Sequence, residues 1–308
     1  MAAVSSSAEY NRMKEVKEFD ETKMGVKGLT DSGITTIPKF FVQMPEVRST
    51  LKPCSEDPAG IPLIDLSRMN SPDHRPRIVD ELREAARQEL GFLPKSIKSF
   101  HEQPQELKAK HYVRAVQSGY ASNIDLFRSK AASWHDFVHM CMSPEPADVD
   151  QIPDACRSEI VAWDKEATMV AETVAELLSE GLGVAAGKLR EAGLLATKTI
   201  AGVYYPFCPQ PDLTLGLNHH TDPGIISNGE YTSVEHRVLA NSSNEPRISI
   251  VEFFNVDERV ESHRYRPLPE LVTPESPARY RNFTIKEYHD NLYSKGLDSK
   301  SLVEKLMV

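Results

Sequence analysis

The sequence predicts an α+β protein in which a mainly helical N-terminal part precedes a small β unit. Apolar residues recur at helical spacing in several stretches of the first two thirds of the chain. After Thr197 the composition changes, and short segments rich in Tyr, Thr, Val and Ile are separated by Pro, Gly and Asn. With 308 residues, of which 40% are apolar and 26% charged, the chain is long enough to bury a substantial core.

Net charge and apolar patterning exclude several kinds of partner. The 36 basic and 45 acidic residues give a net charge of −9, which opposes a nucleic-acid backbone. No apolar run approaches the roughly 18 residues of a membrane span, and no apolar signal segment forms near the start of the sequence. The four cysteines stand in no metal-binding or redox spacing. We therefore expect a cytosolic protein that binds neither nucleic acid nor membrane.

The N-terminal part is expected to begin with a helix, a loop and a strand. Residues 8–24 mix charged side chains with apolar ones at every third position, which predicts an amphipathic helix packed on the main body. A Pro-containing stretch leads to Pro62, and residues 63–66 have the length and boundaries of a short buried strand.

Three helices are predicted to follow. Residues 77–90 carry apolar side chains at helical spacing, with Gly91 as a C-cap. A longer helix spans about 158–178 and closes at Gly181 and Gly183, and a shorter one covers 186–192.

The β unit is expected to contain three strands besides the motif segment described next. They span residues 199–205, 231–239 and 247–254. From Thr284 onward the tail is again predicted to be helical, with a break at Gly296.

A histidine–aspartate pair is the sharpest local feature of the sequence. His220 and Asp222 are two positions apart on a segment predicted to be extended, so both side chains point to the same face. His236 supplies a third candidate ligand, and two histidines with one carboxylate form the facial triad that leaves three iron(II) positions open. Five other histidines are interpreted as surface or packing residues: His101, His111, His135, His139 and His219.

An arginine and a serine follow at a spacing that suits a carboxylate ligand. Arg247 and Ser249 lie on the same face of a predicted strand. The guanidinium offers a planar bidentate fork, and the hydroxyl adds a hydrogen bond. A surface salt-bridge donor beside a strand hydroxyl is the alternative reading of the pair. The order H-x-D, H, R-x-S is more specific than any one of its parts.

Several longer segments resemble plant iron(II)- and 2-oxoglutarate-dependent dioxygenases. They are NHHTDPG, ISNGEYTSVEHRVL, PRISIVEFFN, YYPFCPQPDLTLG and PLPELVTPESPARYR, with GVKGLTDSGITTIPKFF and IPLIDLS similar to that family's N-terminal domain. The subgroup most resembled is that of the 1-aminocyclopropane-1-carboxylate oxidase homologues, which includes grass benzoxazinoid dioxygenases. The resemblance covers nearly the whole chain and implies a double-stranded β-helix (jelly-roll) core behind a helical N-terminal domain.

Transferred position by position, the resemblance implies a set of site residues. The iron ligands are His220, Asp222 and His236. The cosubstrate is held by Arg247 and Ser249, with Tyr205 as a further contact, and Val203 stands where the family usually has asparagine.

The implied reaction consumes dioxygen and hydroxylates or otherwise oxidises a small plant secondary metabolite. The named oxidase uses ascorbate in place of 2-oxoglutarate, and the R-x-S pair alone does not separate these two chemistries. The closer subgroup resemblance favours 2-oxoglutarate. Neither the organic substrate nor the oligomeric state can be read from the sequence.

The chain departs from the family pattern by its length. Only 13 residues, 223–235, separate Asp222 from His236, whereas the family places several strands there. Four strands with their turns need roughly 30–40 residues. A smaller loss is predicted after Gly91.

The sequence is therefore expected to hold a truncated jelly roll. We divide it into a lead-in (1–60), a helical domain (61–180, shortened near 92–100) and a dioxygenase domain with a C-terminal helix (195–308, shortened near 224–226). The second reading is a catalytically inactive splice variant or gene-model remnant that acts as a binding protein.

Overall fold

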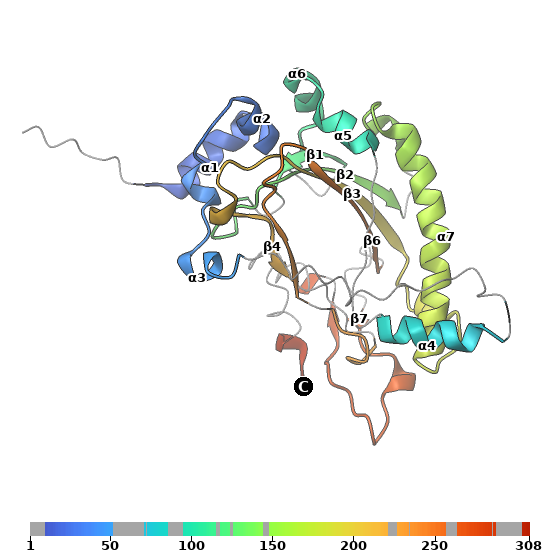
Figure 1. The fold of residues 1–308 in the computed structure, drawn as a ribbon. Helices are drawn as coiled ribbons and strands as arrows, with labels where there is room; N and C mark the ends of the chain where they lie inside the picture. Colours follow the sequence, from blue (N-terminus) through green and yellow to red (C-terminus); the bar gives the residue numbers. More distant parts are fainter. Residues whose placement is uncertain are drawn as a thin grey trace, which may run out of the picture.

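An antiparallel sheet of four strands, in the order β1-β2-β3-β6, organises the computed structural model of the chain (Figure 1). The strands are β1 (Gly119–Ser122), β2 (Asp136–Ser143), β3 (Thr197–Tyr205) and β6 (Arg247–Asn255). The structure describes residues 10–51, 71, 73–85, 95–114, 118–123, 126–143, 148–220, 227–233, 235–256, 264–284, 286–287 and 304–308.

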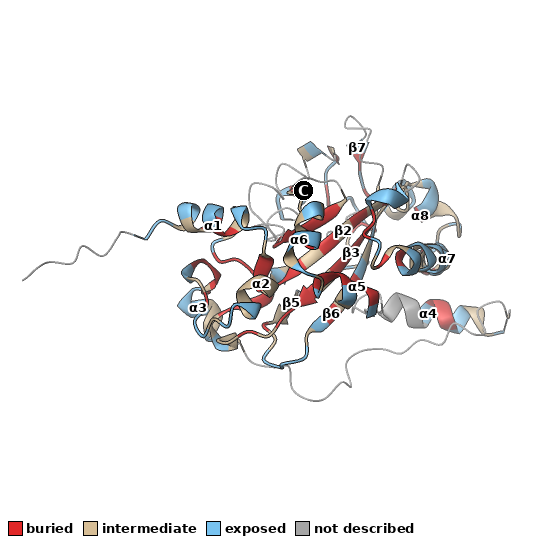
Figure 2. Ribbon diagram, turned by 90° about the horizontal axis from the view of Figure 1, so that it is seen from above, coloured by how far each residue is buried: buried red, intermediate tan, exposed pale blue. Residues whose placement is uncertain are grey.

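The sheet has one face in the core and one that is only half-covered. Along β2, buried and half-buried residues alternate through all eight positions, as the period of a strand requires. Val138 and Met140 of β2 join Ile200 of β3 and Ile250 of β6 in the main apolar cluster. Buried residues accordingly gather along these strands, while the outer surface of α7 is exposed (Figure 2).

Helices cover the buried face of the sheet. The long helix α7 (Arg157–Gly181) matches the predicted one, and Gly183 takes a positive φ of 76° just beyond its end. The other predicted helices appear as α4 (Arg75–Ala85) and α8 (Lys188–Glu191). Further short helices are α3 (Pro45–Arg48), α5 (Lys95–His101) and α6 (Gln105–Lys108), with 3₁₀ turns at Lys39–Phe41, Ala109–His111, Val149–Gln151, Pro211–Leu213 and Pro269–Leu271.

The predicted N-terminal helix at 8–24 corresponds to α1 (Arg12–Glu21). A second helix that was not predicted, α2 (Gly25–Asp31), follows after Lys23, which has a positive φ of 53°. The Asp136 carboxylate of β2 accepts hydrogen bonds from the first backbone N–H groups of α2, at 2.7 and 2.8 Å. This buried contact fixes α2 to the sheet.

A second, two-stranded sheet pairs β4 (Leu215–His220) with β5 (His236–Leu239). The predicted strand at 231–239 is wrong in its first half, because residues 227–231 form a turn in which Asn228 and Gly229 have positive φ. A last pair, β7 (Arg264–Tyr265) with β8 (Phe283–Thr284), packs its own small cluster.

The strands β3, β4, β5 and β6 of the C-terminal part are nested. The inner two, β4 and β5, pair with each other, and the flanking β3 and β6 pair along nine residues each. The predicted strand at 63–66, the residues after Ala85 up to Phe92, Asp222, and the tail from 288 to 303 lie outside the described residues.

Candidate functional site

The two candidate histidine ligands face each other across the β4–β5 pair. His220 and His236 are register partners, and their ring centroids lie 4.1 Å apart with the planes inclined by 55°. Both residues are half-buried. Two imidazoles at this separation can bind one metal ion.

A backbone carbonyl fixes the orientation of the first ring. Nδ1 of His220 lies 2.9 Å from the carbonyl oxygen of Asn218, and since a carbonyl only accepts, Nδ1 carries the hydrogen. The lone pair of the neutral ring is then on Nε2, and such a hydrogen bond to the other nitrogen is typical of metal-binding histidines.

The third predicted ligand, Asp222, lies outside the described residues. Within the described part of the chain, no group of three or more His, Cys, Asp or Glu side chains is placed to hold a metal ion. Two imidazoles and a carboxylate two positions after the first are a donor set that fits iron(II).

The three candidate cosubstrate residues come together on the half-covered face of the β3–β6 pair. Tyr205 is opposite Arg247, and Val203 is opposite Ser249. The Arg247 guanidinium lies 4.9 Å from the centre of the Tyr205 ring. Burial raises the pKa of Tyr205, and the charge and hydrogen bonds of Arg247 and Ser249 partly offset that rise. A guanidinium, a serine hydroxyl and a phenol thus share one surface.

Gly216 joins this surface to the histidine pair. A Cβ at Gly216 would lie 3.0 Å from Cδ1 of Tyr205 and 2.7 Å from the Leu239 carbonyl oxygen. Strand β4 therefore passes directly against Tyr205, four residues before His220. A glycine inside a strand is a known signal of close backbone approach, so the sequence held a clue to this contact.

His135, interpreted from sequence as a surface or packing residue, is buried between the two sheets. Its Nδ1 donates to the Gly216 carbonyl oxygen at 2.6 Å, and its ring lies 5.8 Å from the Tyr205 ring. Burial lowers the pKa of His135 to about 4, so the imidazole is neutral at pH 7. His101 is also buried, whereas His219 is exposed.

Two carboxyl groups that no sequence motif indicates, those of Glu252 and Asp164, lie at the opposite face of the sheet. Burial and the nearby Asp164 raise the pKa of Glu252 to about 7. Asp164 of α7 accepts from Nζ of Lys198 at 2.7 Å. This cluster joins α7 to the sheet and is separate from the histidine pair.

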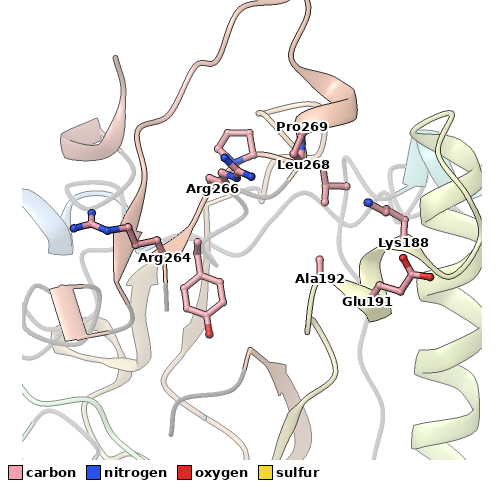
Figure 3. A pocket seen from close by; sticks show the side chains of 9 residues that line it. Lys188, Glu191, Ala192, Arg264, Arg266, Leu268 and Pro269 are labelled. Atoms are coloured by element: carbon pink, nitrogen blue, oxygen red, sulfur yellow. The ribbon is translucent and has the colours of Figure 1, made fainter. Parts of the chain in front are cut away.

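A cavity of about 340 Å³ lies between α8 and the segment 264–269 (Figure 3). Basic side chains of Lys188, Arg264 and Arg266 line it together with Glu191. Lys188 forms an ion pair with Glu270 at 2.5 Å, so part of this positive charge is already neutralised. The histidine pair is not in its lining.

Solved structures share the fold of this chain. JOX2, in its crystal structure in complex with 2OG, Fe and JA, has a TM-score of 0.75 with this chain at 24% identity, covering 92% of this chain and 97% of JOX2. The dioxygenase for auxin oxidation in rice has a TM-score of 0.59 at 19% identity, covering 75% and 95%. The fold is that of the iron(II) and 2-oxoglutarate oxygenases, with a jelly-roll core.

Curated relatives define the family. No family model matches the chain. 1-Aminocyclopropane-1-carboxylate oxidase homolog 3 of Arabidopsis thaliana is 33% identical over 354 residues, covering 95% of this chain and 96% of the relative. The homolog of Solanum lycopersicum is also 33% identical, covering 97% and 98%. The chain belongs to the family of 1-aminocyclopropane-1-carboxylate oxidase homologues.

The relatives also reveal how much shorter this chain is. Since 95% of the chain is about 293 residues, about 60 of the 354 aligned positions face a gap in it. Among the described residues, no helix is both long and apolar enough to cross a membrane.

Proposed function

We propose that the chain binds iron(II) and 2-oxoglutarate and oxidises a small plant secondary metabolite with dioxygen. The observation that supports this most is the double pairing in the structure. His220 is opposite His236 on β4–β5, Tyr205 is opposite Arg247 on β3–β6, and Gly216 of the strand that carries His220 packs against Tyr205. The first pair supplies imidazole ligands for a metal, and the second supplies a guanidinium and a phenol for a carboxylate.

Each residue has a role in this proposal. His220 and His236 hold the metal, with Asp222 as the third ligand. Arg247 presents a bidentate fork to the distal carboxylate of 2-oxoglutarate, and Ser249 and Tyr205 donate further hydrogen bonds to it. Bound iron(II) supplies the activation of dioxygen, coupled to decarboxylation of the cosubstrate. Ascorbate is the alternative reductant, as in the named oxidase.

Related proteins support the choice of cofactors. JOX2 was crystallised with 2OG and Fe, and a full-length protein of Neurospora crassa with alpha-KG and 5-formyluracil. We assign the metabolite to plant secondary metabolism because curated relatives come from Arabidopsis and tomato. We place the reaction in the cytosol because the sequence holds no apolar signal segment or membrane span. We also retain the proposed domain division, with the losses near residues 92–100 and 224–226.

A catalytically inactive remnant is the second candidate function. It is favoured by the 13 residues between Asp222 and His236 and by the roughly 60 aligned positions that this chain lacks. The structure pairs β4 directly with β5, so a short connection is enough to join these two strands.

An anaerobic titration of the purified chain with iron(II) and then 2-oxoglutarate separates the two functions. The weak metal-to-ligand charge-transfer band of the chelate should appear, and His220→Ala should abolish it. A folded protein that gives no band supports the remnant and excludes the dioxygenase. Replacing 2-oxoglutarate by ascorbate in the same titration should leave the band absent.

A further inference from the structure

We propose that Asn218 is a positioning residue that aims His220 at the metal, and that Gln43 of the N-terminal part holds Asn218 in place. This inference rests on the proposed function, because it concerns the ligand geometry of the same site. It assigns a role to the N-terminal segment that the sequence motifs alone do not give.

Strand β4, which carries His220, has an irregular pairing register just before His220. Leu217 is opposite Val238 and His220 is opposite His236, so three steps on β4 correspond to two on β5. This is a β-bulge at Asn218 and His219, and bulges re-aim side chains beside active sites. A bulge interrupts the ladder, so its orientation depends on contacts other than strand pairing.

Asn218 supplies those contacts with every polar group it has. Its backbone N–H donates to Oγ of Ser133 at 3.1 Å, and its side-chain amide donates to the Ala131 carbonyl at 3.2 Å. Its side-chain oxygen accepts from Nε2 of Gln43 at 2.7 Å, and its carbonyl accepts from Nδ1 of His220. Two separate segments are thereby tied to the iron ligand.

Gln43 is a rigid anchor for this network. It is 8% exposed, and its own backbone N–H donates to the Leu213 carbonyl at 2.8 Å. The preceding Phe41 is fully buried and packs edge-to-face on Trp134 at 4.9 Å. Because its backbone is bonded and its side chain is buried, Gln43 loses little further entropy when it holds Asn218.

The network has a direct chemical consequence at His220. With the bulge held, the Asn218 carbonyl stays at Nδ1, and the neutral ring keeps one tautomer with its lone pair on Nε2. If the bulge relaxes, the Asn218 carbonyl moves away from Nδ1 and this restraint on the tautomer of His220 is lost. Second-sphere partners of this kind change metal affinity by roughly 10–100-fold.

The test compares substitutions of two glutamines, Gln43 and Gln210, that each form one side-chain hydrogen bond between the N-terminal part and the chain around β4. Gln43→Leu keeps the side-chain size and removes the hydrogen bond to Asn218. Gln210→Leu is the matched control, because Oε1 of Gln210 accepts from the Ile37 backbone N–H at 3.0 Å without reaching Asn218. Both remove one side-chain hydrogen bond between the N-terminal part and the chain around β4.

Two measurements are made on the full-length chain. Nitrogen-15 NMR of the imidazoles, without metal, reports the tautomer of His220, which should be Nδ1–H in the unsubstituted chain and in Gln210→Leu but mixed in Gln43→Leu. Anaerobic titration with Co(II) should show about a 10-fold higher Kd for Gln43→Leu and an unchanged one for the control.

The outcomes distinguish the inference from the proposed function. If the unsubstituted chain holds His220 as Nε2–H, or if Gln43→Leu leaves both readouts unchanged, Asn218 and Gln43 do not position the ligand. If both variants change both readouts equally, the effect is general packing and the inference is overturned. Tautomer control without any Co(II) binding supports the positioning network and refutes the proposed function.

Discussion

Arg247 is the residue whose chemistry the proposed function uses most directly. Its guanidinium lies over the Tyr205 ring, and its planar fork suits a carboxylate in a way that an ammonium does not. Arg247→Lys should therefore raise the Kd for 2-oxoglutarate at least about 10-fold while leaving the Kd for iron(II) unchanged. The charge-transfer titration measures both. Arg190→Lys, at an exposed ion pair with Glu172, is the control and should change neither.

The two buried histidines make the stability of the fold sensitive to acid. Burial lowers the pKa of His135 to about 4 and that of His101 to about 3. Below pH 6.5 these two histidines become protonated in the unfolded chain but stay neutral in the folded chain. The free energy of unfolding therefore decreases as the pH falls. His135 alone accounts for up to about 3 kcal/mol between pH 6.5 and 4.

Urea unfolding at pH 7 and pH 5 measures this loss. His135→Asn retains a donor for the Gly216 carbonyl but cannot be protonated, and it should reduce the difference between the two pH values. If the difference in unfolding free energy between pH 7 and pH 5 is unchanged, then the folded chain protonates His135 as readily as the unfolded chain does.

Glu252 of β6, which lies near Asp164 of α7, gives the stability of the fold the opposite pH dependence. The pKa of Glu252 is raised to about 7 by burial and by Asp164, while Lys198 lowers it. An acid whose folded-state pKa is raised favours folding below its ordinary value of 4.5, and this contribution is lost as the pH rises from 4.5 to about 7.

Glu252→Gln should remove that dependence and stabilise the fold at pH 8, since an amide has no charge to bury. Thermal unfolding at pH 5 and pH 8 tests it. We expect a higher Tm for the variant at pH 8 and little difference at pH 5. A lower Tm at pH 8 would show that the ionised carboxylate stabilises the α7–β6 contact.

Elements with strong periodicity could be predicted from the sequence, and those with weak signals could not. Helix α7 and the strands β3 and β6 were predicted to within a few residues, because their apolar patterns are long. Strand β2 was missed. Its burial alternates, but its sequence DFVHMCMS does not alternate between apolar and polar residues, and Met, Cys and His have no strong preference for strands.

The candidate site could be predicted in composition but only partly in geometry. Arg247 and Ser249 lie on one face of β6, as their two-residue spacing predicts, whereas the pairings of His220 with His236 and of Tyr205 with Arg247 come from the structure. The β-bulge at Asn218 and the contact of Gly216 with Tyr205 depend on tertiary packing, which no local pattern encodes. The role of Asp222 as the third metal ligand stays a prediction.

At the scale of the whole molecule, one face of β6 exposes apolar side chains that a closed barrel would cover. In the described part of the chain, β6 pairs on one side only, and Val251 and Phe253 are 37% and 43% exposed on its half-covered face. A long apolar edge strand of this kind promotes association between chains. Phe253→Lys should reduce light scattering at a given concentration and leave the free energy of unfolding within about 1 kcal/mol.

A matched change on the opposite side of the molecule gives the control for this prediction. Met169→Lys replaces an exposed apolar residue of α7, 54% exposed, and should leave the scattering unchanged. Equal effects of the two variants would attribute association to net charge instead of to the β6 surface.

The nesting of β4–β5 inside β3–β6 has a consequence for how the chain folds. His220 and His236 are 16 positions apart in the sequence, so they form a local contact of low contact order. A hairpin of this size closes in about 1–10 μs, before strands that must meet across longer separations. We expect the two imidazoles to meet early, so that Co(II) present during refolding accelerates closure of the outer strands in stopped-flow experiments. In this chain the metal would then act as a folding nucleus as well as a cofactor.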